Sequence, residues 1–78
     1  MSDLRIHIER EIDIIAARQA GRQMAGQLGF SATDQTLIAT AISEVARNIL
    51  IYAQRGEIQI EQIGDGTRTG IQVVVAGE

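Results

Sequence analysis

The spacing of the hydrophobic residues changes twice along this 78-residue chain, and these changes leave few ways to fold it. Residues 4–9 alternate between apolar and polar, which predicts a half-buried strand. From Ile12 to Leu28 an apolar residue returns every three or four positions, which predicts an amphipathic helix. Gly29 is placed to stop that helix. The small residues of its stripe predict close packing against a neighbour; the stripe consists of Ile14, Ala17, Gly21, Met24, Ala25 and Leu28.

The rest of the chain predicts a second helix followed by two strands. Ser31 and Asp34 have the spacing of a capping box, so a helix is expected from about Ala32 to Tyr52 or Ala53, with Gly56 ending the turn after it. Residues 57–63 and 71–76 are predicted strands, joined through the hairpin sequence Asp65-Gly66. The fold class expected is α+β, a two-layer sandwich of two helices on a mainly antiparallel three-stranded sheet. The apolar arc of the second helix is expected to contain Leu37, Ile38, Ala41, Ile42, Val45, Ile49 and Tyr52.

Composition excludes several classes of function. The chain has no Cys, so it has neither disulfides nor a thiolate zinc site, and its one histidine, His7, cannot form a metal site alone. The formal net charge of −3 gives no support for nucleic-acid binding. No apolar run is expected to be long enough to cross a bilayer, and residues 1–9 do not resemble a signal peptide. A cytoplasmic protein with no membrane and no nucleic-acid partner is expected.

Glu44 and Asn48 lie four residues apart on the second predicted helix and therefore share a face. On a helical wheel Asn48 falls between Leu37 and Ala41, inside the expected apolar arc, and Glu44 lies at its edge. A polar group left unpaired in a buried stripe costs about 1–3 kcal/mol, so a partner is expected. An amide and a carboxylate suit Mg²⁺, which makes Asn48 a candidate metal ligand and Glu44 a candidate orienting group in phosphoryl transfer. The alternative is a solvated helix edge that happens to hold Glu and Asn.

Arg18 and Arg22 form a second pair at the same spacing, on the flank of the first predicted helix. They are either a solvated basic face or an anchor for an acidic partner or a phosphate. The glycines at 64, 66 and 70 do not follow a strand and open a helix, so they predict neither a dinucleotide-binding fingerprint nor a Walker loop.

Three segments together resemble a known family. They are Asp13–Arg22 (DIIAARQAGR), Leu28–Phe30 (LGF) and Thr40–Ile49 (TAISEVARNI). They are similar to the RsbT-type switch kinases of bacterial stress signalling, which belong to the GHKL (Bergerat-fold) ATPases. The resemblance covers essentially all 78 residues, and the pair Glu44 and Asn48 matches the N-box of that family.

The resemblance implies a serine/threonine protein kinase that uses ATP and Mg²⁺. Asn48 would coordinate the Mg²⁺ of Mg-ATP, and Glu44 would be the catalytic or orienting carboxylate. Arg22, together with Arg18, would lie on the helix surface that these kinases use to contact partners. The family phosphorylates STAS-domain proteins of the stressosome and, on release, binds and activates a PP2C-type phosphatase.

The chain departs from the family at its end. In the family the strand matching residues 71–76 is followed by an Asp-x-Gly-x-Gly box, an ATP lid and a second glycine box. Residues 1–78 are therefore expected to be the N-terminal part of such an ATPase domain, inactive alone, with a free sheet edge that favours homodimerisation. Two rival functions stay open: a non-catalytic partner-binding module, and an anti-sigma factor of the same superfamily.

Overall fold

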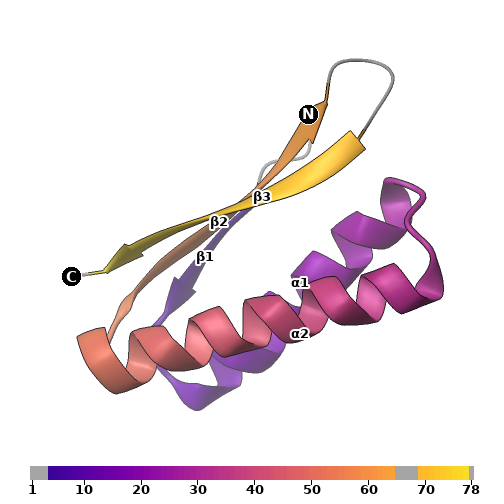
Figure 1. Ribbon diagram of the computed structural model, residues 1–78. Helices are drawn as coiled ribbons and strands as arrows, with labels where there is room; N and C mark the ends of the chain where they lie inside the picture. Colours follow the sequence, from indigo (N-terminus) through magenta and orange to yellow (C-terminus); the bar gives the residue numbers. More distant parts are fainter. Residues whose placement is uncertain (1–3, 65–68, 78) are drawn as a thin grey trace.

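The computed structural model describes residues 4–64 and 69–77, and within them two helices cover one face of a three-stranded sheet (Figure 1). The expected α+β two-layer fold is confirmed. The elements follow the predicted order, with a short π-helical turn, η1, added after the second helix. Their bounds are β1 Leu4–Ile8, α1 Glu11–Gln27, α2 Ala32–Asn48, η1 Ile49–Ala53, β2 Gly56–Gly64 and β3 Thr69–Gly77.

The sheet has the order β1-β2-β3, and both pairs of strands are antiparallel. Ile58 pairs with Ile6 on one side and with Val75 on the other, and Ile60 pairs with Leu4 and Val73. Because side chains alternate along a strand, this register places these six apolar residues on the face beneath the helices. The predicted Asp65-Gly66 turn lies outside the described residues.

Helix α1 begins and ends as its sequence predicts. The carboxylate of Asp13 accepts hydrogen bonds from the backbone N–H groups of Glu9 (2.9 Å) and Arg10 (3.0 Å), which satisfies donors that the first turn leaves unpaired. Gly29 has a φ of 88°, a conformation that favours glycine and ends the helix. Along its predicted stripe Ile14, Ala17, Gly21, Met24 and Ala25 are buried and Leu28 is half-buried.

Helix α2 starts where the side chain of Ser31 accepts a hydrogen bond from the backbone N–H of Asp34, at 3.1 Å. Its α-helical part ends at Asn48, and the backbone continues as the π-helical turn η1. Gln54 then has a φ of 68°, which is uncommon for a residue with a side chain. Gly56 follows as the first residue of β2, so the turn ends where the sequence predicts.

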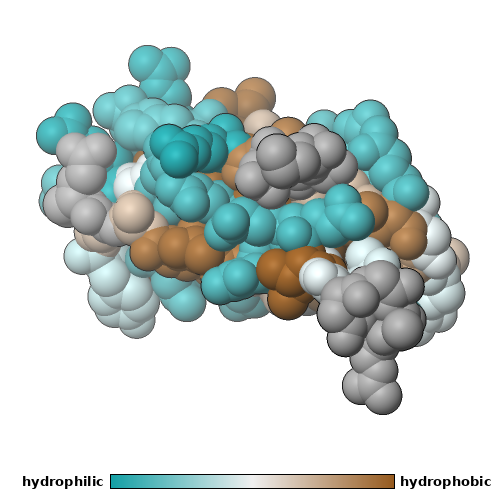
Figure 2. Space-filling view, turned by 90° about the horizontal axis from the view of Figure 1, so that it is seen from above, coloured by the Kyte–Doolittle hydropathy of each residue, from teal (hydrophilic) through white to brown (hydrophobic). Residues whose placement is uncertain are grey.

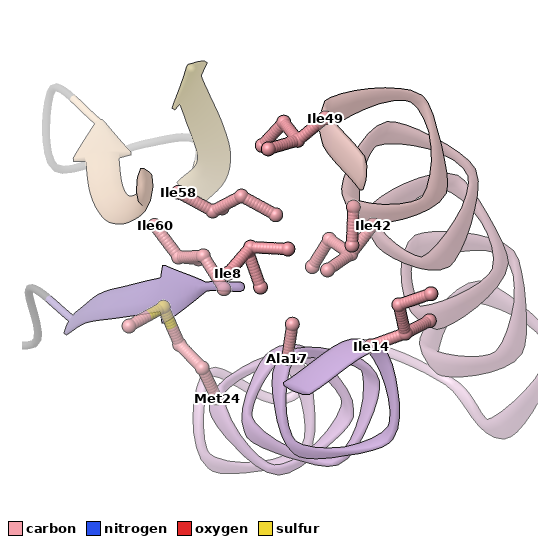
Figure 3. Packing of buried hydrophobic residues seen from close by; sticks show 9 residues of the cluster. Ile8, Ile14, Ala17, Met24, Ile42, Ile49, Ile58 and Ile60 are labelled. Atoms are coloured by element: carbon pink, nitrogen blue, oxygen red, sulfur yellow. The ribbon is translucent and has the colours of Figure 1, made fainter. Parts of the chain in front are cut away.

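The core lies between the sheet and the two helices (Figure 3), with isoleucines from the strands pointing toward isoleucines, Ala17 and Met24 of the helices. Helices α1 and α2 approach each other closely at Gly21. A Cβ at that position would overlap the Cδ1 atom of Ile42, a side chain that is itself fully buried. The expected close packing of the small residues in α1 is therefore confirmed.

One expectation about the helices is wrong. The continuous helical run Ala32–Ala53 has 22 residues and contains an 18-residue window with a mean hydropathy of 1.2, enough in length and composition to cross a membrane. No uninterrupted apolar segment of that length is present, but a window of this mean hydropathy tolerates the charged side chains of Glu44 and Arg47. Such a run is weak grounds for a membrane segment, because core helices of soluble proteins meet the same criterion. Here part of it packs against α1 and the sheet.

The sheet face turned away from the helices is mostly polar, with Ile63 and Val74 as apolar exceptions. In β1 and β2 the outward positions hold Arg5, His7, Glu57 and Gln59, opposite the buried isoleucines. In the view from above, hydrophobic side chains form separate patches between hydrophilic ones (Figure 2). This surface is typical of a sheet with one solvated face.

Candidate functional site

Glu44 and Asn48 occupy the last turns of α2, just before the backbone changes to the π-helical turn. Such turns are rare and are frequent at functional sites, because they rotate the residues that follow relative to the α-helix before them. Here the turn carries Tyr52, which lies one turn beyond Asn48. The end of α2 is therefore the part of the helix pair with the least regular backbone.

The expectation that Asn48 intrudes on a buried stripe is wrong. Asn48 and Glu44 are both exposed, and so are three residues of the expected arc: Leu37 (62%), Ala41 and Tyr52 (83%). The buried residues of α2 are Ala39, Ile42, Ser43 and Ala46, followed by Ile49 in η1. The close approach of α1 draws the small side chains Ala39, Ser43 and Ala46 inward and turns the other side of α2 toward solvent.

Asn48 nevertheless lies in a concave site. A pocket of about 390 Å³ is formed between the end of α2, η1 and the sheet, and it is lined by Val45, Asn48, Ile49, Tyr52, Ala53 and Val75. This volume falls within the range of small-molecule sites, and an apolar lining with few polar groups is their usual chemistry. The amide of Asn48 is the most strongly polar side-chain group of the lining. We call it the Asn48 pocket.

Tyr52 and Val75 were not singled out from the sequence as site residues. Tyr52, the chain's single tyrosine, was placed in the apolar arc, and its 83% exposure beside Asn48 is what marks it now. Val75 comes from β3, far from Asn48 in sequence, so only the antiparallel pairing of β3 with β2 brings it to the pocket. The position of Tyr52, four residues after Asn48, is the one sequence feature that could have identified it.

Glu44 does not line the Asn48 pocket. Its carboxylate accepts a hydrogen bond from the guanidinium of Arg47 at 3.3 Å, and both side chains are more than half exposed. An exposed pair at this spacing on a helix contributes little to stability and exchanges easily for another partner. Glu44 therefore shares the outer side of α2 with Asn48 and is free to turn toward a ligand at small cost.

The donor set fits magnesium bound mainly through a ligand. Among residues 4–64 and 69–77, no three His, Cys, Asp or Glu side chains gather in a way that could hold a metal ion. Mg²⁺ usually retains waters and takes one or two protein oxygens together with substrate phosphates. One amide oxygen from Asn48, with the carboxylate of Glu44 one turn away, suits a magnesium-phosphate group and does not suit a metal ion held by protein alone.

Arg18 and Arg22 lie together in a second concavity, between α1 and a side of α2 that does not line the Asn48 pocket. Its volume is about 390 Å³, and its lining residues are Arg18, Gln19 and Arg22 of α1 and Thr36, Ala39 and Thr40 of α2. Both arginines are exposed, and within the described residues neither makes a hydrogen bond or an ion pair. We call this the α1–α2 groove. Thr36 and Thr40 were not predicted as site residues, because their role depends on how the two helices pair.

A scan against protein-family profiles finds no matching family. No solved structure matches the chain either. Among curated proteins, the chain is similar to the serine/threonine-protein kinase RsbT of Bacillus subtilis (strain 168), with 51% identity over 69 residues. The match covers 88% of this chain and 52% of that relative, so the chain spans about half the length of the kinase. Because half of the aligned residues are identical along nearly the whole chain, the expected resemblance is confirmed, and this chain is a homologue of about half of the serine/threonine kinase RsbT.

Proposed function

We propose that this chain carries part of the ATP site of a serine/threonine protein kinase of bacterial stress signalling. The observation that carries the proposal is the position of Asn48, whose amide lies in an apolar pocket of a chain 51% identical to a kinase. The substrates proposed are STAS-domain stressosome proteins, and the released kinase would activate a PP2C-type phosphatase. These partners come from the family that the sequence resembles.

The roles proposed for the residues follow from their chemistry. Bound Mg-ATP would supply the phosphoryl group, together with the positive charge of Mg²⁺ that offsets the negative charge of the phosphates. Asn48 would offer its side-chain carbonyl oxygen to the metal ion, and the apolar lining would exclude water from the base. Glu44 would leave Arg47 and orient the acceptor hydroxyl, a role that needs positioning more than basicity. The chain spans 52% of the kinase that it resembles, so the 78 residues alone are expected to be inactive.

The proposed partner site is the exposed pair Arg18 and Arg22, with Arg22 as the principal contact. A cytoplasmic location without nucleic-acid or membrane partners is part of the same proposal. Homodimerisation would use β3, which in the described part of the sheet is paired on one side only, with β2. None of its nine residues, TGIQVVVAG, is charged, and an uncharged edge favours pairing with another chain.

A non-catalytic partner-binding module, or an anti-sigma factor of the same superfamily, is the second candidate function. Two observations favour it. The chain spans 52% of the kinase it resembles, and the α1–α2 groove is lined by none of the residues that form the Asn48 pocket. Such a protein would bind its partner through α1 and α2 whether or not a nucleotide is present.

Calorimetric titration of the chain with Mg-ATP distinguishes the two functions. We expect weak binding that Asn48→Ala reduces about tenfold, the loss of one charge-assisted contact. Because Asn48 is exposed, the circular dichroism spectrum of the variant should be unchanged. Gln23→Ala, which removes an exposed amide from α1 far from the pocket, is the matched control and should bind as the unmodified chain does. A folded chain that takes up no Mg-ATP would contradict the kinase function for this molecule and leave the binding module.

A further inference from the structure

The α1–α2 groove has two walls of different chemistry. On the α1 wall, Arg18 and Arg22 present guanidinium groups that have no partner among the described residues. On the α2 wall, Thr36 and Thr40 are exposed one turn apart, and the hydroxyl of Thr36 donates a hydrogen bond to the backbone carbonyl of Ala32 at 3.1 Å. No carboxylate belongs to the lining, although the chain as a whole has a formal net charge of −3. The groove is therefore a local basic site on an acidic protein, and its charge selects for an acidic ligand.

The spacing of the groups favours an extended ligand over a single ion. Residues four apart on a helix are separated by about 6 Å along its axis, so the two guanidinium groups are offset by one turn. Carboxylates at i and i+4 of a partner helix have the same offset, and each arginine can then bind one of them. Ile15, 44% exposed and one turn before Arg18, continues the same side of α1 with an apolar contact. An acidic amphipathic helix complements this surface, because it carries negative charges one turn apart beside an apolar side.

We propose that the α1–α2 groove binds an acidic helical segment of a partner protein, with Arg18 and Arg22 each pairing with a carboxylate and Thr36 and Thr40 contacting its other side. This inference deepens the partner site of the proposed function, and rests on it, by naming the second wall and the chemistry of the occupant. It does not depend on nucleotide, because none of the groove residues lines the Asn48 pocket.

The test is a titration of the isotope-labelled chain, without nucleotide, followed by amide chemical shifts. The probe is a 20-residue capped peptide designed as an amphipathic helix, with leucine on one face and glutamate at i and i+4 on the other. We expect the largest shifts at Arg18, Arg22, Thr36 and Thr40, and affinity that falls as salt rises. The same peptide with lysine for glutamate should not bind. Shifts centred elsewhere, or equal binding of both peptides, would overturn the proposal.

Charge reversal makes the test sharper. The double variant Arg18→Glu/Arg22→Glu should bind the acidic peptide about 100-fold more weakly, about tenfold for each arginine, and should gain binding of the lysine peptide. Thr40→Glu should weaken binding of the acidic peptide, because it places a negative charge on the opposite wall of the groove. Arg5→Glu, an exposed reversal on the far face of the sheet, is the matched control and should change neither affinity beyond the general effect of net charge. If the double variant binds the acidic peptide as tightly as the unmodified chain, or if Arg5→Glu loses as much affinity as the double variant, the groove is refuted as the binding site.

Two further measurements separate this inference from the kinase proposal. Inorganic phosphate should give no saturable shifts at the four groove residues; binding of phosphate as tight as that of the peptide would mean a simple anion site and would overturn the helical occupant. Asn48→Ala should bind the peptide normally. If the unmodified chain takes up no Mg-ATP but still binds the peptide, the nucleotide site is refuted and the groove assignment is not affected.

Discussion

Gly21 provides the most direct test of the packing, because substitution there sets two effects against each other. In an ordinary helix interior, Gly→Ala stabilises by about 1 kcal/mol. At Gly21 the added Cβ would overlap the Cδ1 atom of Ile42, whose side chain is 1% exposed and has little space in which to move. The Cγ1 atom of Ile42 would lie 3.5 Å away, which is ordinary contact, so the conflict comes from one methyl group.

The size of the effect follows from these terms. Overpacking of a well-packed core costs about 1–3 kcal/mol, so Gly21→Ala should destabilise the chain by about 1 kcal/mol after the helical gain is subtracted. Ile42→Val removes the conflicting methyl group and alone costs about 0.5–1.5 kcal/mol. In that background Gly21→Ala should stabilise by about 1 kcal/mol, because the clash is gone and the helical gain remains. The two substitutions should therefore couple by about 2 kcal/mol.

Urea unfolding of the four chains of this double-mutant cycle, followed by circular dichroism, measures the coupling. Gly26→Ala is the matched control, since its Cβ would meet only Gln35 at 3.5 Å or beyond; it should be neutral or stabilising by a few tenths of a kcal/mol. If Gly21→Ala stabilises the unmodified chain as much as it stabilises the Ile42→Val chain, the coupling is zero and the close approach of α1 and α2 is refuted.

Two further substitutions test the ends of the helices. Gln54 has a φ of 68°, so Gln54→Gly should stabilise the chain by about 0.5–1 kcal/mol in urea unfolding, and a loss of stability would contradict the left-handed conformation. The pKa of the Asp13 carboxyl lies below its ordinary value, because the backbone N–H groups of Glu9 and then Arg10 stabilise the charged form. A lowered folded-state pKa means that this stabilisation is present at neutral pH and is lost as the pH falls through that lowered pKa, below about pH 4. The difference in unfolding free energy between the unmodified chain and Asp13→Asn should therefore shrink on acidification, and a difference independent of pH would count against the cap.

The first helix could be oriented from its sequence, and the second could not. In α1 one apolar stripe around Gly21 returns every three or four residues, and periodicity identifies it as the buried side, although Ile12 and Ile15 outside it are exposed. In α2 the apolar residues, from Leu37 and Ile38 round to Ala46, occupy more than half of the circumference, and several orientations bury a similar area. The packing of α1 against α2 determines the orientation, since the small residues Ala39, Ser43 and Ala46 are buried whereas Ala41, which is equally small, is exposed. That information lies in the pairing of the helices and not in either segment.

The candidate site was found in the sequence for a reason that the structure corrects. Glu44 and Asn48 were singled out as polar groups within a buried stripe, yet both are exposed. The π-helical turn that presents Tyr52 could not be predicted either, because no local pattern distinguishes it from a continued α-helix. The β3 side of the pocket required the hairpin register, which brings Val75 beside a helix that ends more than twenty residues earlier.

The corrected position of Asn48 supports a ligand site on different grounds. The pocket around it is lined by apolar residues of α2, η1 and β3, and two of them, Tyr52 and Val75, are exposed. The charged residue Glu44 shares this side of α2, but exposed apolar side chains that lie beside an amide are not stabilised by water and can be covered by a ligand. An amide surrounded by apolar groups matches a ligand that is partly planar and apolar and partly charged. A nucleotide with its metal ion has that composition, and this is why the Asn48→Ala titration carries more weight than the sequence motif itself.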